Sequence, residues 1–195
     1  MPGPTRPTDA LVLVDVLADF GHSEGPRLFD AYRSAVPALK RSIHAARGAD
    51  IPIVYANDDF GTWSGSREAV LREAVRRAPE PGLITAVAPT EADAFLVKPR
   101  YSAFDHTPLD LLLEELGTRR VVLAGTATEM CVAQSAIDAR EAGLHASVLV
   151  PACASVDEEN AQVALTYLSR VAGVLLHREG PALPDPEPRE RPPVG

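Results

Sequence analysis

Residues 121–131 read VVLAGTATEMC, an apolar run followed by small residues, one acid and a cysteine. The run 121–124 is typical of a strand buried on both faces, and small residues lead from it to the cysteine. Residues 131–142 have helical spacing and stop at Gly143, so the segment predicts a strand, a tight turn and a helix. Cys131 either packs at that crowded turn or presents its sulfur at the edge of a sheet.

The same alternation of apolar runs and helical stretches continues along the chain in both directions. Strands are predicted at 10–14, 51–56, 94–97, 120–124, 146–150 and 173–176, and further helices at 27–47, 67–77, 109–116 and 157–170. Such alternation predicts an α/β fold, a parallel sheet with helices on both faces. We expect one domain over residues 1–179 and a proline-rich tail, 180–195, that is extended or disordered.

Bulk composition limits the partners. The chain has 195 residues, 46% apolar and 24% charged, and a formal net charge of −8. An acidic protein with scattered basic residues predicts neither a nucleic-acid partner nor an anionic membrane surface. With two cysteines and no apolar run long enough to span a membrane, we expect a cytoplasmic protein with at least one free thiol.

Three polar residues stand where predicted strands end. Asp15 follows the first strand, Lys98 follows the third, and Cys131 begins the helix after the fourth. Ligands of parallel sheets bind outside the carboxyl ends of the strands, so the three are expected to meet there. An ammonium group and a helix N-terminus should lower the pKa of the thiol, and a carboxylate can move its proton. Each residue taken alone is also an ordinary strand-end or packing residue.

Three segments together resemble a known family. LVLVDVLADF (11–20), VKPRYSAF (97–104) and LAGTATEMCVAQSAIDA (123–139) are similar, in order and spacing, to the signature segments of the isochorismatase-like cysteine hydrolases, which include nicotinamidases and N-carbamoylsarcosine amidases. The resemblance runs from about residue 10 to about residue 174. It implies a three-layer αβα sandwich with a mainly parallel, six-stranded sheet, Rossmann-like in arrangement.

The resemblance also implies a catalytic apparatus. Asp15, Lys98 and Cys131 take the positions of the triad, Thr126 and Ala127 those of a cis peptide, and the backbone N–H groups of Ala127 and Cys131 those of an oxyanion hole. The implied reaction is hydrolysis of a small amide or ureido compound through a thioester. A cysteine at this position favours cleavage of a C–N bond over that of a vinyl ether.

The residues that follow the second strand differ from those that hold a metal in some relatives. Metal-dependent nicotinamidases hold a divalent ion with an Asp-x-His pair and a further histidine after the second strand. Residues 57–63 read NDDFGTW here, without histidine. We therefore expect no catalytic metal and no cofactor, with Asp58 and Asp59 as loop-capping or solvated acids.

Six residues are candidate substrate contacts: Phe20, Asn57, Trp63, Arg100, Tyr101 and Phe104. Trp63 is either part of a lid or a packed loop aromatic. Arg100 either binds a substrate carboxylate or pairs with an acid such as Asp105. Leu17 replaces a glutamine that relatives often carry after the catalytic Asp.

Several residues stay open at this stage. Glu129 either disfavours the thiolate or caps a helix, and Cys153 is expected to be a buried packing residue. The alternative to an enzyme is a catalytically silent binding protein of the same fold. A nucleotide-binding protein is disfavoured because no Gly-x-Gly-x-x-Gly follows the first strand. The substrate is not predicted, and a homodimer or homotetramer is expected from the resemblance.

Overall fold

The computed structural model describes residues 8–18, 20–61, 63 and 65–178. In chain order the elements are β1 Thr8–Val14, α1 Gly25–Gly48, β2 Ile53–Asn57, α2 Arg67–Arg77, α3 Pro81–Thr85, β3 Ala94–Val97, α4 Leu109–Glu115, β4 Thr118–Thr126, the π-helical turn η1 Thr128–Val132, α5 Ala133–Glu141, β5 His145–Ala154, α6 Glu158–Arg170 and β6 Leu175–His177. The proline-rich tail predicted at 180–195 lies outside the described residues.

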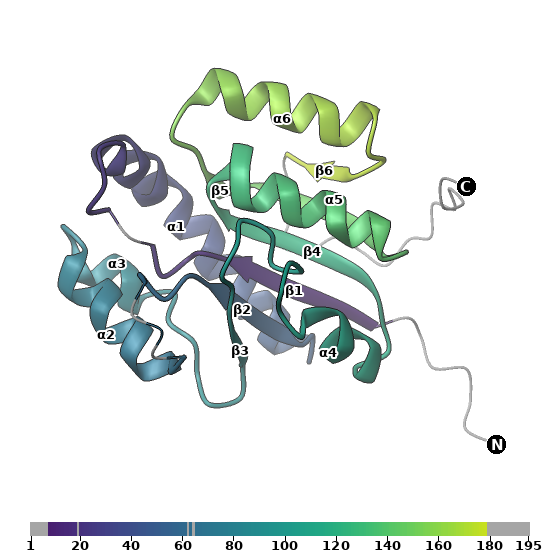
Figure 1. The fold of residues 1–195 in the computed structure, drawn as a ribbon, viewed down its shortest axis with the longest axis horizontal. Coiled ribbons are helices and arrows are strands. Elements are labelled where there is room, and N and C mark those ends of the chain that lie inside the picture. Colours follow the sequence, from purple (N-terminus) through teal and green to yellow (C-terminus); the bar gives the residue numbers. More distant parts are fainter. Residues whose placement is uncertain (1–7, 19, 62, 64, 179–195) are drawn as a thin grey trace.

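The six strands form one sheet in the order β3-β2-β1-β4-β5-β6, and every neighbouring pair is parallel (Figure 1). The predicted α/β fold with a six-stranded sheet is therefore confirmed. The sheet places β1 and β4 side by side at its centre, where both faces are covered. This explains why their sequences are continuous apolar runs rather than alternating ones.

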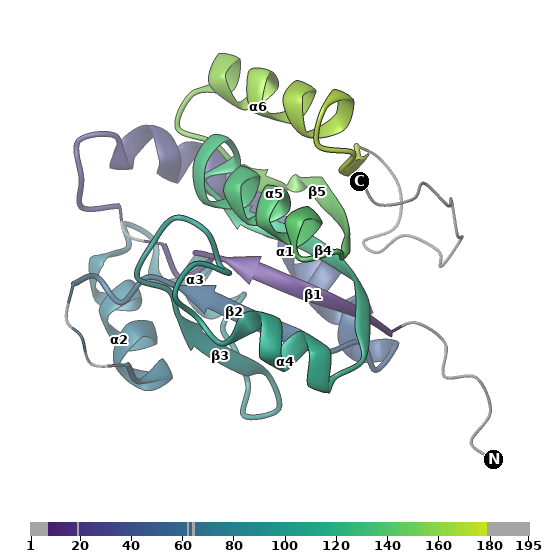
Figure 2. The same cartoon turned by 45° about the vertical axis from the view of Figure 1, so that its right-hand side comes forward.

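Successive residues of β1 point to opposite faces of the sheet. Leu11 and Leu13 pack with α1, α2 and α3, whereas Ala10, Val12 and Val14 pack with α4, α5 and α6. The two apolar cores make the three-layer sandwich, and Figure 2 shows the helices on the two sides of the sheet. Among the described helices, none is both long enough and apolar enough to cross a bilayer.

The predicted elements and the observed ones differ at their ends. Helix α3, five residues beginning at Pro81, was not predicted, because it is too short to show helical periodicity. The stretch predicted as one helix from residue 131 is a π-helical turn followed by α5. Strand β5 extends to Ala154, and its pairing with β4 shifts register between Leu123 and Gly125. This irregularity lies directly before the turn that carries Cys131.

Candidate active site

Asp15 lies one residue beyond β1, in a left-handed backbone conformation with φ 47°. Asp is among the residues that tolerate this region best. Its N–H donates to the Ala56 carbonyl at 2.9 Å, and its carbonyl accepts from Thr126 Oγ1 at 2.9 Å. The neighbouring strands β2 and β4 thus fix the backbone from both sides. The carboxylate accepts from the Asp58 N–H at 2.8 Å through Oδ1.

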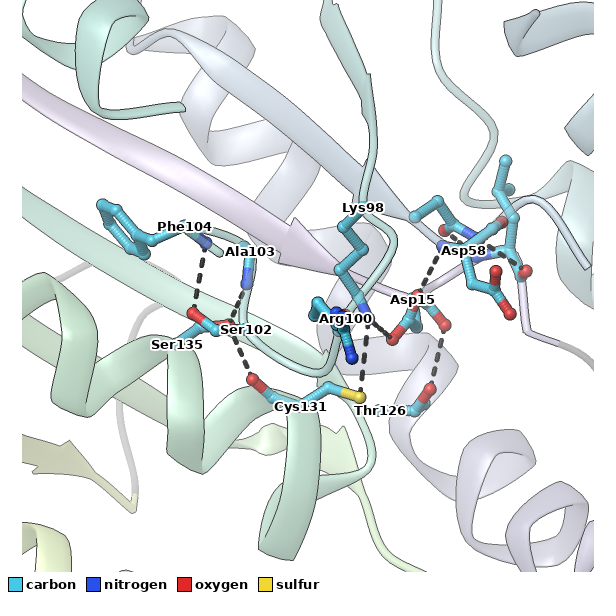
Figure 3. A network of polar contacts seen from close by, with 12 residues as sticks. Asp15, Asp58, Lys98, Arg100, Ser102, Ala103, Phe104, Thr126, Cys131 and Ser135 are labelled. Atoms are coloured by element: carbon cyan, nitrogen blue, oxygen red, sulfur yellow. Dashed lines mark hydrogen bonds and ion pairs between the residues drawn. The ribbon is translucent and has the colours of Figure 1, made fainter. Parts of the chain in front are cut away.

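Lys98 follows β3 and is 3% exposed. Its Nζ lies 2.7 Å from Asp15 Oδ2, 2.9 Å from the Arg100 carbonyl and 3.6 Å from Cys131 Sγ (Figure 3). An ammonium group has three N–H donors, so these three acceptors use all of them. Strands β3 and β1 are separated by β2, and the long lysine side chain bridges the gap between the two strand ends.

Cys131 lies in the π-helical turn between β4 and α5 and is partly exposed. Ser135, one turn later and fully buried, donates to the Cys131 carbonyl at 2.6 Å and accepts from the Ala103 N–H at 2.8 Å. One hydroxyl group therefore joins the turn that carries the sulfur to the loop that follows Lys98. Figure 3 shows this pair of contacts beside the Lys98 group.

The charges around the sulfur correct one expectation from the sequence. The pKa of Cys131 is raised to about 12, with burial as the largest cause; the Asp15 carboxylate adds to the rise, and Lys98 opposes both. The predicted lowering of the thiol pKa is therefore wrong. Burial also raises the pKa of Asp15, against the effect of Lys98. For Lys98, burial favours the neutral amine, but Asp15 and Cys131 outweigh it and the pKa is raised. The resting site is an ion pair beside a neutral thiol.

The turn between β4 and Cys131 is tightly constrained. The peptide bond between Thr126 and Ala127 is cis, and the Ala127 carbonyl accepts from the N–H groups of Met130 and Val132 at 3.1 and 3.2 Å. Gly125 has φ 131°, and a Cβ atom there would lie 1.9 Å from the Val14 carbonyl oxygen. A glycine is thus required where β4 passes closest to the residue before Asp15.

Glu129 has a role that the sequence left undecided. Its Oε1 accepts from the N–H groups of Val156 and Asp157 at 2.9 and 3.2 Å. The carboxylate therefore holds the segment that enters α6, whose first turn is capped separately by the Asp157 side chain on the Asn160 N–H. Glu129 Oε2 is buried and has no hydrogen-bond partner within the described residues.

Two of the six candidate substrate contacts are part of the framework. Phe20 is 7% exposed and packs edge-on against Phe29 and Tyr32. Asn57 is 1% exposed, and its carboxamide bonds both the N–H and the carbonyl of Leu17 at 3.0 Å. These contacts fix the segment after Asp15, so Asn57 positions the backbone beside the carboxylate.

The other four candidates differ in exposure. Trp63 is 86% exposed and Tyr101 58% exposed, while Arg100 is exposed and Phe104 is half-buried against the α4–α6 core. Arg100 and Tyr101 belong to the loop that starts at Lys98, and the Arg100 carbonyl accepts from the same Nζ that contacts the sulfur. Asp105, the acid suggested as a partner for Arg100, instead contacts His106.

The residues where some relatives hold a metal do not fit one here. Asp58 is exposed, and Asp59 is buried with Oδ1 accepting from the Gly61 N–H at 3.1 Å. Within the described part of the chain, no three His, Cys, Asp or Glu side chains converge in a way that would hold a metal ion. A metal-free site stays a prediction.

Comparisons with known proteins now give the family. The profile of the Isochorismatase domain matches residues 9–179. An uncharacterized isochorismatase family protein, YaaI of Bacillus subtilis, is 33% identical over 83% of this chain and 89% of its own. The maleamate amidohydrolase of Pseudomonas putida is 29% identical over 72% of this chain and 69% of its own.

A solved structure agrees with the sequence relatives. The N-carbamoylsarcosine amidase of Thermoplasma acidophilum superposes with a TM-score of 0.66 at 27% identity, covering 88% of this chain and 96% of that one. The named relatives include amidohydrolases that act on C–N bonds other than peptide bonds. With its matched domain, its parallel sheet and the residues gathered at the carboxyl ends of β1, β3 and β4, this chain belongs to the isochorismatase family.

Proposed function

We propose that the protein is a cysteine-dependent amidohydrolase that cleaves a C–N bond of a small amide or ureido substrate through a thioester, without a catalytic metal. The observation that carries the proposal is the position of Lys98 Nζ, 2.7 Å from Asp15 Oδ2 and 3.6 Å from Cys131 Sγ. A base, a cation and a sulfur nucleophile within hydrogen-bond reach of one another are the components of covalent acyl transfer.

The first half of the reaction forms the thioester. Asp15 accepts the Cys131 proton as the sulfur bonds to the substrate carbonyl carbon, and the N–H groups of Ala127 and Cys131 stabilise the oxyanion. Asp15 then donates that proton to the departing nitrogen, the C–N bond breaks, and ammonia or an amine leaves. The raised pKa of Asp15 brings this carboxyl closer to the neutral range in which a general acid and base works best.

The second half releases the acid. Asp15 removes a proton from water, the hydroxide adds to the thioester carbonyl, and the C–S bond breaks as the sulfur recovers a proton. Lys98 has a constant task in both halves. Its ammonium group remains bonded to Asp15 and compensates the charge that appears on the sulfur or on the carboxylate.

The direct test traps the thioester. Wild-type protein and Cys131→Ala are incubated with a panel of aliphatic amides, aromatic amides and N-carbamoyl amino acids; ammonia release is measured, and hydroxylamine is added to intercept an acyl group. We expect hydroxamate and ammonia with the wild type alone. Equal ammonia release by both proteins on every substrate would contradict the proposal and leave a binding protein of the same fold.

We also propose that the chain is cytoplasmic and forms a homo-oligomer. Both cysteines are free, as is usual in a reducing compartment. In support of assembly, α6 exposes Val163 and Tyr167, four residues apart, and Val171 directly follows the helix; the three are 66%, 51% and 63% exposed. Light scattering of the wild type and of Tyr167→Glu tests assembly: a monomeric wild type would contradict it.

A further inference from the structure

The loop that follows Lys98 is fixed at two points. At its start, the Arg100 carbonyl accepts from Lys98 Nζ at 2.9 Å. Three residues later the Ala103 N–H donates to Ser135, the hydroxyl that also bonds the Cys131 carbonyl. The backbone of Arg100 and Ala103 is therefore held by Lys98 and Ser135, the same two side chains that contact Cys131 (Figure 3).

Arg100 is the residue on this loop that carries a charge into solvent. Its side chain is exposed, and among the described residues no carboxylate pairs with its guanidinium. By contrast, Arg47 and Arg120 each form an ion pair with an aspartate. An unpaired guanidinium on a fixed backbone keeps its planar set of donors available for a ligand.

The triad does not supply a net charge of its own. Lys98 and Asp15 form an ion pair, and Cys131 is a neutral thiol because its pKa is raised to about 12. The chain as a whole is acidic, with a formal net charge of −8, so an anionic ligand is not attracted at long range. A substrate with an acidic group therefore needs a local cation near the sulfur, and Arg100 is the cation whose backbone is bonded to the lysine that contacts the sulfur.

We propose that Arg100 binds a carboxylate of the substrate, so that this protein prefers amides or ureido compounds that carry an acidic group over their neutral counterparts. That the ligand is a substrate rests on the proposed function, whereas the binding of a carboxylate by Arg100 does not. Arg100 acts through its guanidinium, and its carbonyl serves Lys98 whatever the side chain is. Substitution of the side chain thus removes the site and leaves the backbone contact in place.

The first test does not need turnover. Iodoacetate carries a carboxylate where iodoacetamide carries a carboxamide, and both reagents alkylate cysteine thiols. We expect the ratio of the iodoacetate rate to the iodoacetamide rate to fall by about tenfold in Arg100→Met and to be largely kept in Arg100→Lys. A charge-assisted hydrogen bond contributes a free energy of about this size. Changes in the thiol pKa affect both reagents alike and cancel in the ratio. Arg119→Met, an exposed arginine near the amino end of β4, is the matched control.

The second test uses turnover. Succinamate and N-carbamoylglycine are compared with their neutral counterparts succinamide and N-carbamoylglycinamide, as kcat/KM in wild type, Arg100→Met and Arg119→Met. We expect the acidic member to be preferred in the wild type and in Arg119→Met, and the preference to fall about 10- to 100-fold in Arg100→Met.

The outcomes separate the two proposals. Hydrolysis that depends on Cys131 but shows no acidic preference, with an alkylation ratio unchanged in Arg100→Met, would overturn the carboxylate site and leave the amidohydrolase in place. A ratio that falls without hydrolysis of any amide would support the carboxylate site and count against the hydrolase.

Discussion

Cys131 and Cys153 are alike in three respects and differ in one. Both are free, both are partly buried, and burial raises the pKa of each to about 12. Cys153, on β5, donates to the Leu149 carbonyl four residues before it, at 3.3 Å. Cys131 instead faces Lys98, which in turn holds Asp15.

Neither exposure nor pKa distinguishes Cys131, the proposed nucleophile, from Cys153. The charged neighbours do, because a carboxylate within reach can take the proton at the moment the sulfur attacks.

Removing the sulfur from each site in turn should give the widest separation. Cys131→Ala is expected to lose ammonia release by about 1,000-fold or more, since the covalent route is gone, while Cys153→Ala stays within about threefold of wild type. Initial rates on one hydrolysed amide measure both. Comparable losses in the two variants would show that the cysteines differ in nothing that matters for the reaction.

Asp15→Asn should make the sulfur more reactive while making the protein inactive. Burial is the main cause of the high pKa of Cys131, the Asp15 charge adds to it, and Lys98 opposes both. Without the negative charge the pKa falls, and each unit of the fall gives about tenfold more thiolate at neutral pH. We expect faster alkylation of Cys131 by iodoacetamide at pH 7.5, together with a loss of hydrolysis.

Cys153 is the internal control for the same experiment, followed by peptide mass spectrometry. It has no charged group among the causes of its pKa, so its labelling should not change. Slower labelling of Cys131 in Asp15→Asn would mean that the carboxylate assists the thiolate rather than opposing it.

Gly125 is connected to both cysteine sites. It pairs with Cys153 in the sheet and begins the turn that leads to Cys131. A methyl group at Gly125 would meet the Val14 carbonyl at 1.9 Å, so Gly125→Ala should lower the free energy of unfolding by about 3 kcal/mol. Gly48→Ala, with open space around it, should stay within about 1 kcal/mol. Urea denaturation distinguishes them, and equal midpoints would refute the steric argument.

Ser135→Ala should have the smallest effect, and one that is confined to the Cys131 side. Both Ser135 and Ser42 donate to a carbonyl four residues earlier, and both are buried. Each alanine variant should lose about 1 kcal/mol of stability. Because Ser135 also links the Lys98 loop to the Cys131 turn, only Ser135→Ala should lower kcat/KM, by about tenfold. Equal activity of Ser135→Ala and Ser42→Ala would argue against a role of this link in the reaction.

Much of the architecture could be predicted because local sequence patterns indicate the strands and their ends. Apolar runs such as 10–14 marked the central strands, and the first polar residue after a run marked the sheet edge at which Asp15 and Lys98 lie. A parallel sheet places those ends together whatever the details of the helices. The π-helical turn and α3 escaped notice because five residues carry no detectable period.

The roles of individual polar groups needed the folded chain. Glu129 contacts Val156 and Asp157, 27 and 28 positions away, and Asn57 contacts Leu17, 40 positions away. The direction of the pKa shift of Cys131 depends on whether burial and the Asp15 charge outweigh Lys98. That balance follows from how deeply the sulfur is buried and how far it lies from each charge. The spacing of residues along the sequence does not give this balance.

The protonated state of Cys131 has a consequence for oxidative damage. Peroxide attacks thiolates, and the first oxidised product, a sulfenic acid, forms in proportion to the thiolate fraction. With a pKa of about 12, Cys131 presents almost no thiolate at neutral pH even though its side chain is partly exposed. Burial, with the Asp15 charge added to it, keeps the proton on the sulfur, so we expect the resting thiol to resist oxidation by peroxide.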